Sequence, residues 1–218
     1  MQGTVHVVDD DKSVRTALTR LLSVSGFRVR TYEGGQQLLD VGFNERDTEP
    51  SCILLDLQMS GLDGLTTFEK LTASHHPPVI FVTAHGDVHA CATVMKHGAF
   101  DFLEKPVGAA RLTLVVDKAL TLCAAEQDAR LTLDGYRRRI GLLTPREQEV
   151  MRHIISGRLN KVIGRDLAIS EKTVKVHRAR VLGKMRVRSV AELTRICVIV
   201  GLEPAETEAY QSWSAASV

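Results

Sequence analysis

Five short runs of apolar and β-branched residues alternate with amphipathic segments along residues 1–122. The segments between the runs have helical spacing, and in Lys12–Ser25 the apolar residues fall on one face before a glycine stop. Strands that alternate with helices predict an α/β doubly wound domain with five parallel strands. The expected strands are Thr4–Val8, Arg28–Tyr32, Cys52–Asp56, Val79–Thr83 and Asp101–Glu104.

Charged and hydroxyl side chains stand at the carboxyl ends of four of these strands. Asp9 and Asp10 follow the first, Asp56 closes the third, Thr83 closes the fourth and Lys105 follows the fifth. In doubly wound sheets the ligand site lies outside the carboxyl ends of the strands. Clustered carboxylates without counter-ions would repel one another, so a functional site explains them better than scattered turn residues do.

An aspartate can attack phosphorus and form an acyl phosphate, and this chemistry needs neutralisation of charge more than acid–base catalysis. We therefore expect Asp56 to accept a phosphoryl group beside Mg²⁺ or Mn²⁺, which are bound by oxygen ligands. The expected metal site consists of Asp9, Asp10, Asp56 and the backbone carbonyl of Gln58, with Asp9 either behind the direct ligands or reaching the ion through water. Lys105 would balance the phosphoryl charge, and Thr83 would donate a hydrogen bond to it. Asp11 is expected only to cap the first helix.

The two halves of the chain carry opposite charge. Residues 1–123 contain 11 Lys and Arg against 15 Asp and Glu, whereas residues 137–201 contain 16 against 5. A basic half favours nucleic acid or an anionic membrane as a partner. We expect two domains, residues 1–123 and 141–201, joined by a helical or flexible linker over 124–140. Residues 202–218 are expected to form a disordered tail.

Residues 141–201 contain no strand pattern and are expected to form four short helices. Thr144 begins the first with a capping box and a proline at the first helical position. The second covers residues 160–167, and a tight turn separates it from a longer basic helix that is capped by Ser170. A short helix, a turn and a longer basic helix predict a helix-turn-helix. Ser189 is expected to cap the last helix.

The basic helix carries an exposed Val176 beside Lys172 and Lys175, which is unusual for a solvated face. In a major groove, lysine can read guanine and an apolar side chain can touch the methyl group of thymine. A solvated basic helix is the common alternative. The 9 Lys and Arg against 2 Asp and Glu in residues 160–188 favour DNA. The expected DNA contacts are Lys161, Lys172, Thr173, Lys175, Val176, His177, Arg178, Ala179 and Arg180.

The first half resembles the CheY-like receiver domain of two-component response regulators, which has a flavodoxin-like fold. The resemblance rests on five motifs at the family's spacing: VVDDD (7–11), LLDLQM (54–59), VTAHGDV (82–88), HGAFDFL (97–103) and EKP (104–106). It implies that Asp56 accepts phosphate from a histidine of a sensor kinase. It also implies that Thr83 is a switch hydroxyl and Phe102 a switch aromatic, although Phe is most often a core residue. Ser60 departs from the family, which usually has proline there.

The second half resembles the LuxR-type (GerE) DNA-binding domain. The matching motifs are LTPREQEV (143–150), GRLNK (157–161), LAISEKTVKVHR (167–178) and KMRVRS (184–189). The resemblance places Lys175, Val176 and Ala179 at the groove-contacting positions, and Ala179 is shorter than the polar residue of some members. It also implies that the last helix, around Glu192 to Ile199, dimerises on DNA.

The whole chain resembles a response regulator of the NarL/FixJ type. The resemblance implies a transcriptional regulator that is phosphorylated by a sensor histidine kinase and binds double-stranded promoter DNA as a homodimer. RNA polymerase is a further candidate partner, and no membrane is expected. The only expected chemistry is metal-dependent self-phosphorylation at Asp56 and slow self-dephosphorylation, so the chain is not expected to be a turnover enzyme.

An aspartate at the end of a strand is also compatible with two other functions. A phosphatase of the haloacid-dehalogenase type needs a second carboxylate two residues after the nucleophile, and this chain has Gln58 there. A DNA-binding protein could instead use the receiver as a phosphate-independent dimerisation module. The complete set of acidic residues argues against that second alternative, which stays open from the sequence alone.

Four cysteines, Cys52, Cys91, Cys123 and Cys197, lie far apart, and no CxxC pair occurs. Their spacing argues against a clustered metal site or a redox dithiol and fits a reducing cytosol. The first expected strand begins within a few residues of Met1, which leaves no room for a signal peptide. The longest apolar run near the end, Ile196–Leu202, is too short to span a bilayer. A cytoplasmic location is therefore expected.

Overall fold

The structure is a computed structural model of the 218-residue chain. It describes residues 3–43, 47–84 and 88–205, with only the backbone described at 88–91. Within the described chain, two compact units can be separated, residues 1–128 and 129–218. The predicted tail lies outside the described residues from 206 onward, as does the side chain of Cys91.

The first unit contains a parallel sheet of five strands in the order β2-β1-β3-β4-β5. This arrangement confirms the prediction of a doubly wound α/β domain. The strand order reverses between β1 and β3, where neighbouring strands are followed by helices on opposite faces. The strands are β1 (Thr4–Val8), β2 (Arg28–Tyr32), β3 (Ser51–Asp56), β4 (Val79–Thr83) and β5 (Asp101–Glu104).

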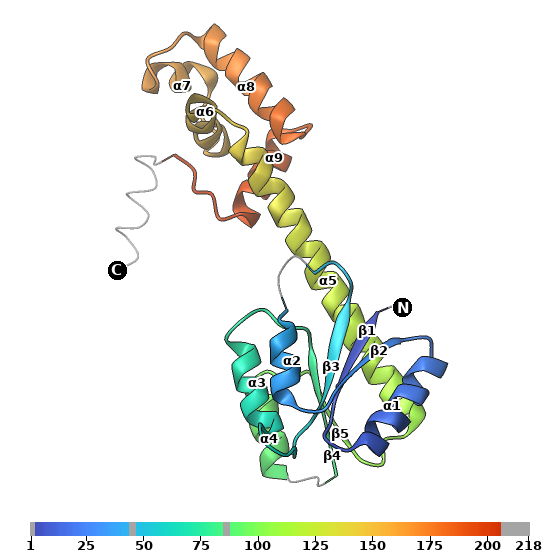
Figure 1. The fold of residues 1–218 in the computed structure, drawn as a ribbon. Helices are drawn as coiled ribbons and strands as arrows, with labels where there is room; N and C mark the ends of the chain where they lie inside the picture. Colours follow the sequence, from blue (N-terminus) through green and yellow to red (C-terminus); the bar gives the residue numbers. More distant parts are fainter. Residues whose placement is uncertain (1–2, 44–46, 85–87, 206–218) are drawn as a thin grey trace. The chain divides into compact units, whose positions relative to one another are not determined.

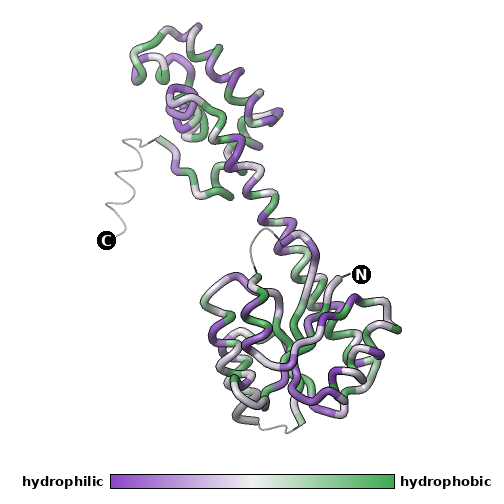
Figure 2. The backbone as a smooth tube through the Cα atoms, in the orientation of Figure 1, coloured by the Kyte–Doolittle hydropathy of each residue, from purple (hydrophilic) through white to green (hydrophobic). Residues whose placement is uncertain are grey.

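Helices cover both faces of the sheet, with α1 and α5 on one face and α2, α3 and α4 on the other (Figure 1). Because side chains alternate along a strand, Cys52 and Leu54 of β3 enter one core, and Ile53 and Leu55 enter the other. The inner strands are hydrophobic almost throughout (Figure 2), as expected for a sheet that is buried on both faces. The helices are α1 (Lys12–Val24), α2 (Gly35–Val41), α3 (Gly64–Thr72), α4 (Val88–Lys96) and α5 (Ala109–Gly141).

The second unit packs four further helices around a core that includes Val150, Ile163, Val174 and Leu193. The expected caps are present: the Thr144 and Glu147 side chains form a reciprocal capping box, and Ser170 and Ser189 each accept a backbone N–H. The helices are α6 (Pro145–Ile155), α7 (Asn160–Asp166), α8 (Glu171–Met185) and α9 (Val190–Ile199).

Helix α5 continues past Leu122 to Gly141, so the last helix of the first unit and the expected linker form one continuous helix. Residues 124–140, the expected linker, are its C-terminal half. Tyr136 and Ile140 of this half pack against the core of the second unit. In the part of the chain that the structure describes, none of the helices combines the length and the apolar character that crossing a bilayer requires.

Candidate functional site

Three carboxylates gather at the carboxyl ends of β1 and β3. These strands are hydrogen-bonded neighbours, and Asp9 follows one while Asp56 ends the other. One oxygen from each of Asp9, Asp10 and Asp56 lies within 4.8 Å of the others. Asp9 and Asp56 are only 2% and 6% exposed, whereas Asp10 is exposed. Burial of two carboxylates side by side is unfavourable unless a cation neutralises them.

Lys105 supplies positive charge to this cluster from the loop after β5. Its Nζ lies 2.6 Å from Asp9 Oδ2 and 2.9 Å from Asp56 Oδ1. Burial alone would lower the pKa of Lys105, but the hydrogen bonds to Asp9 and Asp56 and their charges raise it. Burial raises the pKa of Asp56 above its ordinary value, although Lys105 opposes this shift. The lysine is therefore held charged between two carboxylates.

Asp10 is held by the loop that follows β3. The backbone N–H of Ser60 donates to Asp10 Oδ2 at 2.7 Å. This hydrogen bond, followed by one from the Ser60 side chain, lowers the pKa of Asp10. The neighbouring Asp11 caps α1, as predicted, by accepting the N–H of Ser13 at 2.7 Å.

Arg15 supports the acidic loop and was missed from the sequence. It is 8% exposed, and its Nη1 donates to the carbonyl oxygens of Asp9 at 2.8 Å and Asp10 at 3.0 Å. Its Nη2 forms an ion pair with Glu33 at 2.9 Å. A signal was present in the sequence, because Arg15 lies three residues before Leu18 on the apolar face of a helix. A cation in that position requires buried acceptors.

The other predicted residues of the site lie around the same edge of the sheet. Thr83 is buried at the end of β4, and its carbonyl accepts the N–H of Lys105 at 2.7 Å. Phe102 is partly buried and packs against the core on the side of α3 and α4. Gln58 has an exposed side chain in the loop after Asp56. That loop turns back closely, since the Gly64 N–H donates to the Leu57 carbonyl at 3.0 Å.

The chemistry of the acidic cluster fits a hard divalent cation. Its ligand atoms are all carboxylate oxygens, which Mg²⁺ prefers over nitrogen or sulfur, and Mg²⁺ commonly keeps several waters besides one or two carboxylates. An exposed Asp10 beside buried Asp9 and Asp56 leaves one side of the cluster open to water and to a phosphoryl donor. The arrangement can therefore hold a metal ion and a transferred anion together beside Lys105.

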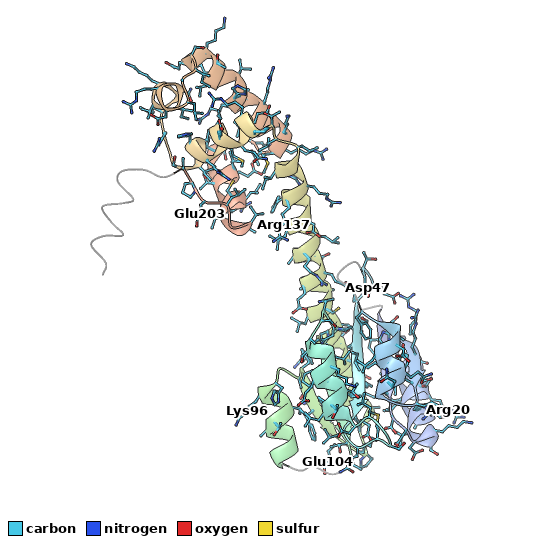
Figure 3. All side chains as sticks on the ribbon, turned by 60° about the vertical axis from the view of Figure 1, so that its left-hand side comes forward. Arg20, Asp47, Lys96, Glu104, Arg137 and Glu203 are labelled. Atoms are coloured by element: carbon cyan, nitrogen blue, oxygen red, sulfur yellow. The ribbon has the colours of Figure 1, made fainter. Side chains whose placement is uncertain are left out.

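The second unit presents a helix-turn-helix made of α7 and α8. Val174, Val181 and Met185 of α8 are buried and Leu182 is partly buried, so this face of the helix packs against the core of the unit. Figure 3 shows nitrogen-tipped side chains that project outward from this unit. The residues expected to contact DNA divide into two groups: His177, Arg178 and Thr173 are partly buried, and the exposed ones are Lys161, Lys172, Lys175, Val176, Ala179 and Arg180.

Both units match known families. Residues 5–117 match the response regulator receiver domain, and residues 141–197 match the bacterial regulatory proteins of the luxR family. The chain is 35% identical to the transcriptional regulatory protein FixJ of Bradyrhizobium diazoefficiens, over 92% of this chain and 97% of that protein. It is 39% identical to FixJ of Azorhizobium caulinodans, over 93% of this chain and 95% of that protein.

Solved structures agree with these sequence matches. The response regulator StyR is 40% identical, with a TM-score of 0.81 over 90% of this chain and 98% of that one. Full-length FixJ from B. japonicum is 36% identical, with a TM-score of 0.54 over 91% of this chain and 97% of that one. The chain therefore belongs to the two-component response regulators of the NarL/FixJ type, phosphorylation-dependent transcriptional regulators with a receiver domain and a LuxR-type DNA-binding domain.

Proposed function

We propose that Asp56 is the phosphoacceptor of this regulator and that Asp9 and Asp10 hold the metal ion that its phosphorylation requires. The observation that carries the proposal is the bridging position of Lys105 Nζ, 2.6 Å from Asp9 and 2.9 Å from Asp56. A partly buried lysine between two carboxylates is placed to neutralise an anion added to either of them. Family membership supplies the two partners, a sensor histidine kinase and promoter DNA.

The reaction is a phosphoryl transfer to an Asp56 carboxylate oxygen. A bond forms between that oxygen and phosphorus, the bond between phosphorus and the nitrogen of the donor histidine breaks, and the nitrogen keeps the electron pair. Mg²⁺ bound by Asp9, Asp10, Asp56 and the Gln58 carbonyl would neutralise charge on the phosphoryl oxygens. Lys105 contacts the phosphoryl group from the opposite side, and the Thr83 hydroxyl donates to it.

The site is that of a switch rather than of a turnover catalyst. Gln58 stands two residues after Asp56, so no carboxylate is available there to act as the general acid–base of a phosphatase. The family is one of non-enzymatic regulators. Self-phosphorylation from small phosphodonors and slow hydrolysis of the acyl phosphate complete the proposed chemistry.

The output of the switch is a change in DNA binding. Movement of Thr83 toward the phosphoryl group would let Phe102 turn inward, which alters the surface formed by α4, β5 and α5. We infer that this change promotes a homodimer that binds promoter DNA through α8 in the cytoplasm. RNA polymerase is the proposed target of the DNA-bound dimer.

The test replaces the phosphoacceptor and measures both ends of the switch. Wild-type protein treated with beryllofluoride and Mg²⁺ should dimerise and bind promoter DNA more tightly, and chelation of Mg²⁺ should abolish both effects. Asp56→Asn should fail to respond. Asp63→Asn is the matched control, because Asp63 only caps α3 and asparagine caps a helix equally well.

Sizing by light scattering and DNA binding by fluorescence anisotropy report the two effects. A response of Asp56→Asn equal to that of treated wild type would refute the assignment of the phosphoacceptor. A wild type that dimerises and binds DNA equally with and without beryllofluoride would support the alternative of a phosphate-independent dimerisation module.

A further inference from the structure

We propose that the backbone N–H of Ser60 positions Asp10 for metal binding, so that residue 60 tunes the metal affinity of the receiver. The inference rests on the proposed function, since it assigns a role within the same metal site. Its physical basis is the 2.7 Å hydrogen bond from the Ser60 N–H to Asp10 Oδ2. Proline has no N–H and could not make this bond.

The three carboxylates of the cluster are fixed in different ways. Asp9 is buried, and its Oδ1 accepts the N–H of Asp11 at 2.9 Å while its Oδ2 accepts from Lys105. Asp56 is buried and accepts from Lys105 at 2.9 Å. Asp10 is exposed, so packing does not restrict its side chain. Its carboxylate accepts from the Ser60 N–H and interacts more weakly with the Ser60 hydroxyl and with its own backbone N–H, so the Ser60 N–H contributes most to its orientation.

The donor is itself held in place by the loop around it. Met59, the preceding residue, is buried in the core on the side of α3. Gly61, the following residue, has a φ of 83°, a left-handed conformation that glycine adopts without strain. The side chain of Asp63 then caps α3 by accepting the N–H of Thr66. An anchored residue on each side keeps the Ser60 N–H directed at Asp10.

The hydrogen bond leaves Asp10 free to bind a metal ion. A carboxylate offers about four acceptor positions on its two oxygens, and the Ser60 N–H occupies one of them. Hydrogen bonds to metal-ligating carboxylates hold the ligands in a geometry that they would otherwise have to adopt on binding. Loss of this bond at an exposed carboxylate should weaken Mg²⁺ binding roughly 2- to 10-fold.

The experiment compares Ser60→Pro with Ser60→Ala in the full chain without phosphodonor. Proline removes the backbone N–H, whereas alanine keeps it and removes only the hydroxyl. Mg²⁺ affinity is measured by isothermal titration calorimetry, and Mn²⁺ affinity by electron paramagnetic resonance. We expect the larger loss of affinity for both ions in Ser60→Pro and a smaller loss in Ser60→Ala, which lacks only the weaker contact of the hydroxyl with Asp10.

Hydrogen exchange provides a second readout that does not depend on the folding of the proline variant. The Ser60 N–H should be protected in wild type and should lose that protection in Asp10→Ala. Unchanged or tighter metal binding by Ser60→Pro would overturn the inference, as would equal losses in the proline and alanine variants or an unprotected Ser60 N–H in wild type.

Asp10→Asn separates this inference from the proposed function. If Asp10→Asn binds Mg²⁺ as wild type does, the acidic cluster is not the metal site and the proposed function fails with the inference. If Asp10→Asn loses Mg²⁺ binding while Ser60→Pro retains it, the metal site stands and the role of Ser60 alone is refuted.

Discussion

Gly164 lies where α7 approaches the turn that leads into α8. A Cβ atom at this position would lie 2.8 Å from the backbone oxygen of Ile169, a distance that side chains essentially never show. Glycine within a helix normally costs up to about 1 kcal/mol relative to alanine. At this position that cost is offset, because the close approach lets the Ile169 N–H donate to the Gly164 carbonyl at 2.9 Å.

Gly164→Ala should therefore destabilise the DNA-binding domain by about 1–3 kcal/mol, since backbone must move to admit the methyl group. Gly183→Ala is the matched control in the same domain. Gly183 lies in α8 with no atom within 4 Å of the added Cβ, so alanine should stabilise by up to about 1 kcal/mol. Chemical denaturation measures both changes, and equal effects of the two substitutions would contradict the steric explanation.

Glu147 gives the DNA-binding domain a pH-dependent stability. This carboxylate is 2% exposed, accepts from Lys184 Nζ at 2.6 Å, and accepts the Thr144 N–H at 2.9 Å. The Lys184 hydrogen bond first, and then that of the Thr144 backbone, lowers the pKa of Glu147 from 4.5 to about 2. A lowered pKa in the folded state stabilises the fold fully above pH 4.5 and progressively less as the pH falls toward 2.

Glu147→Gln should remove that acid-sensitive contribution and lower the free energy of unfolding near pH 7 by about 1–2 kcal/mol. The difference between wild type and variant should shrink as the pH falls from 4.5 toward 2. Denaturation at a series of pH values measures the free energy of unfolding of both proteins. A difference between them that stays constant from pH 4.5 to 2 would show that the pKa of Glu147 is not lowered in the folded state.

Single residues also mark the limit of what the sequence can predict. Asp9, Asp10, Asp56 and Lys105 could be grouped because strand ends meet at one edge of a parallel sheet, whatever the loops do. The Ser60 hydrogen bond could not be foreseen, since it depends on the direction of a backbone N–H in an irregular loop.

Among the secondary-structure elements, the ends of the strands can be predicted from the sequence more accurately than the C-terminal end of α5. Turn residues on both sides bounded each strand, so predicted and observed ends agree closely. No helix-terminating residue follows Leu122 directly in α5. The next segment is polar and contains alanines, so it can remain helical. Helix α2 has only seven residues, which is too short a pattern for its bounds to be predicted from the sequence.

The last turns of α5 hold the end of α8, and this contact can be tested. Arg139 Nη1 donates to the carbonyl of Met185 at 3.0 Å, next to Arg186 in the left-handed conformation that ends α8. Arg139 also lies over the Tyr136 ring, 5.4 Å from its centroid. A cation on the last carbonyls of a helix stabilises them.

Arg139→Ala should lower the stability of the DNA-binding domain by about 1 kcal/mol and speed hydrogen exchange in the last turn of α8. Arg138→Ala is the control, since it removes the same charge from an exposed position on the same turn of α5. Hydrogen exchange measured by mass spectrometry compares the exchange rate of the last turn of α8 in the two variants. Equal exchange in both would mean that charge alone, and not the contact with Met185, supports α8.

The two halves of the molecule, the receiver and the DNA-binding domain, differ in net charge. The receiver half has more acidic than basic residues, which supports a metal site, and the DNA-binding half has 16 Lys and Arg against 5 Asp and Glu. Phosphorylation adds negative charge to the receiver and leaves the basic surface unchanged. A stronger affinity for DNA must therefore come from pairing of two basic surfaces or from better access to one of them.

The salt dependence of DNA binding distinguishes these two routes. Each phosphate neutralised by a basic side chain adds about 0.9 to the slope of log affinity against log salt concentration. If phosphorylation pairs two chains on the promoter, the slope for beryllofluoride-treated wild type should be about twice that for Asp56→Asn. Improved access alone would raise the affinity and leave the slope unchanged.

Substitution of Arg180 shows how many chains contribute to the slope of log affinity against log salt concentration. Arg180 is exposed on α8 and is expected to contact a phosphate, so Arg180→Ala should lower the slope by about 1 for each bound chain. The loss should therefore be about 2 in the treated protein and about 1 in the Asp56→Asn background. Anisotropy titrations over a range of salt concentrations measure both values, and a loss of about 1 in each case would exclude binding as a dimer, because two bound chains must lose two phosphate contacts.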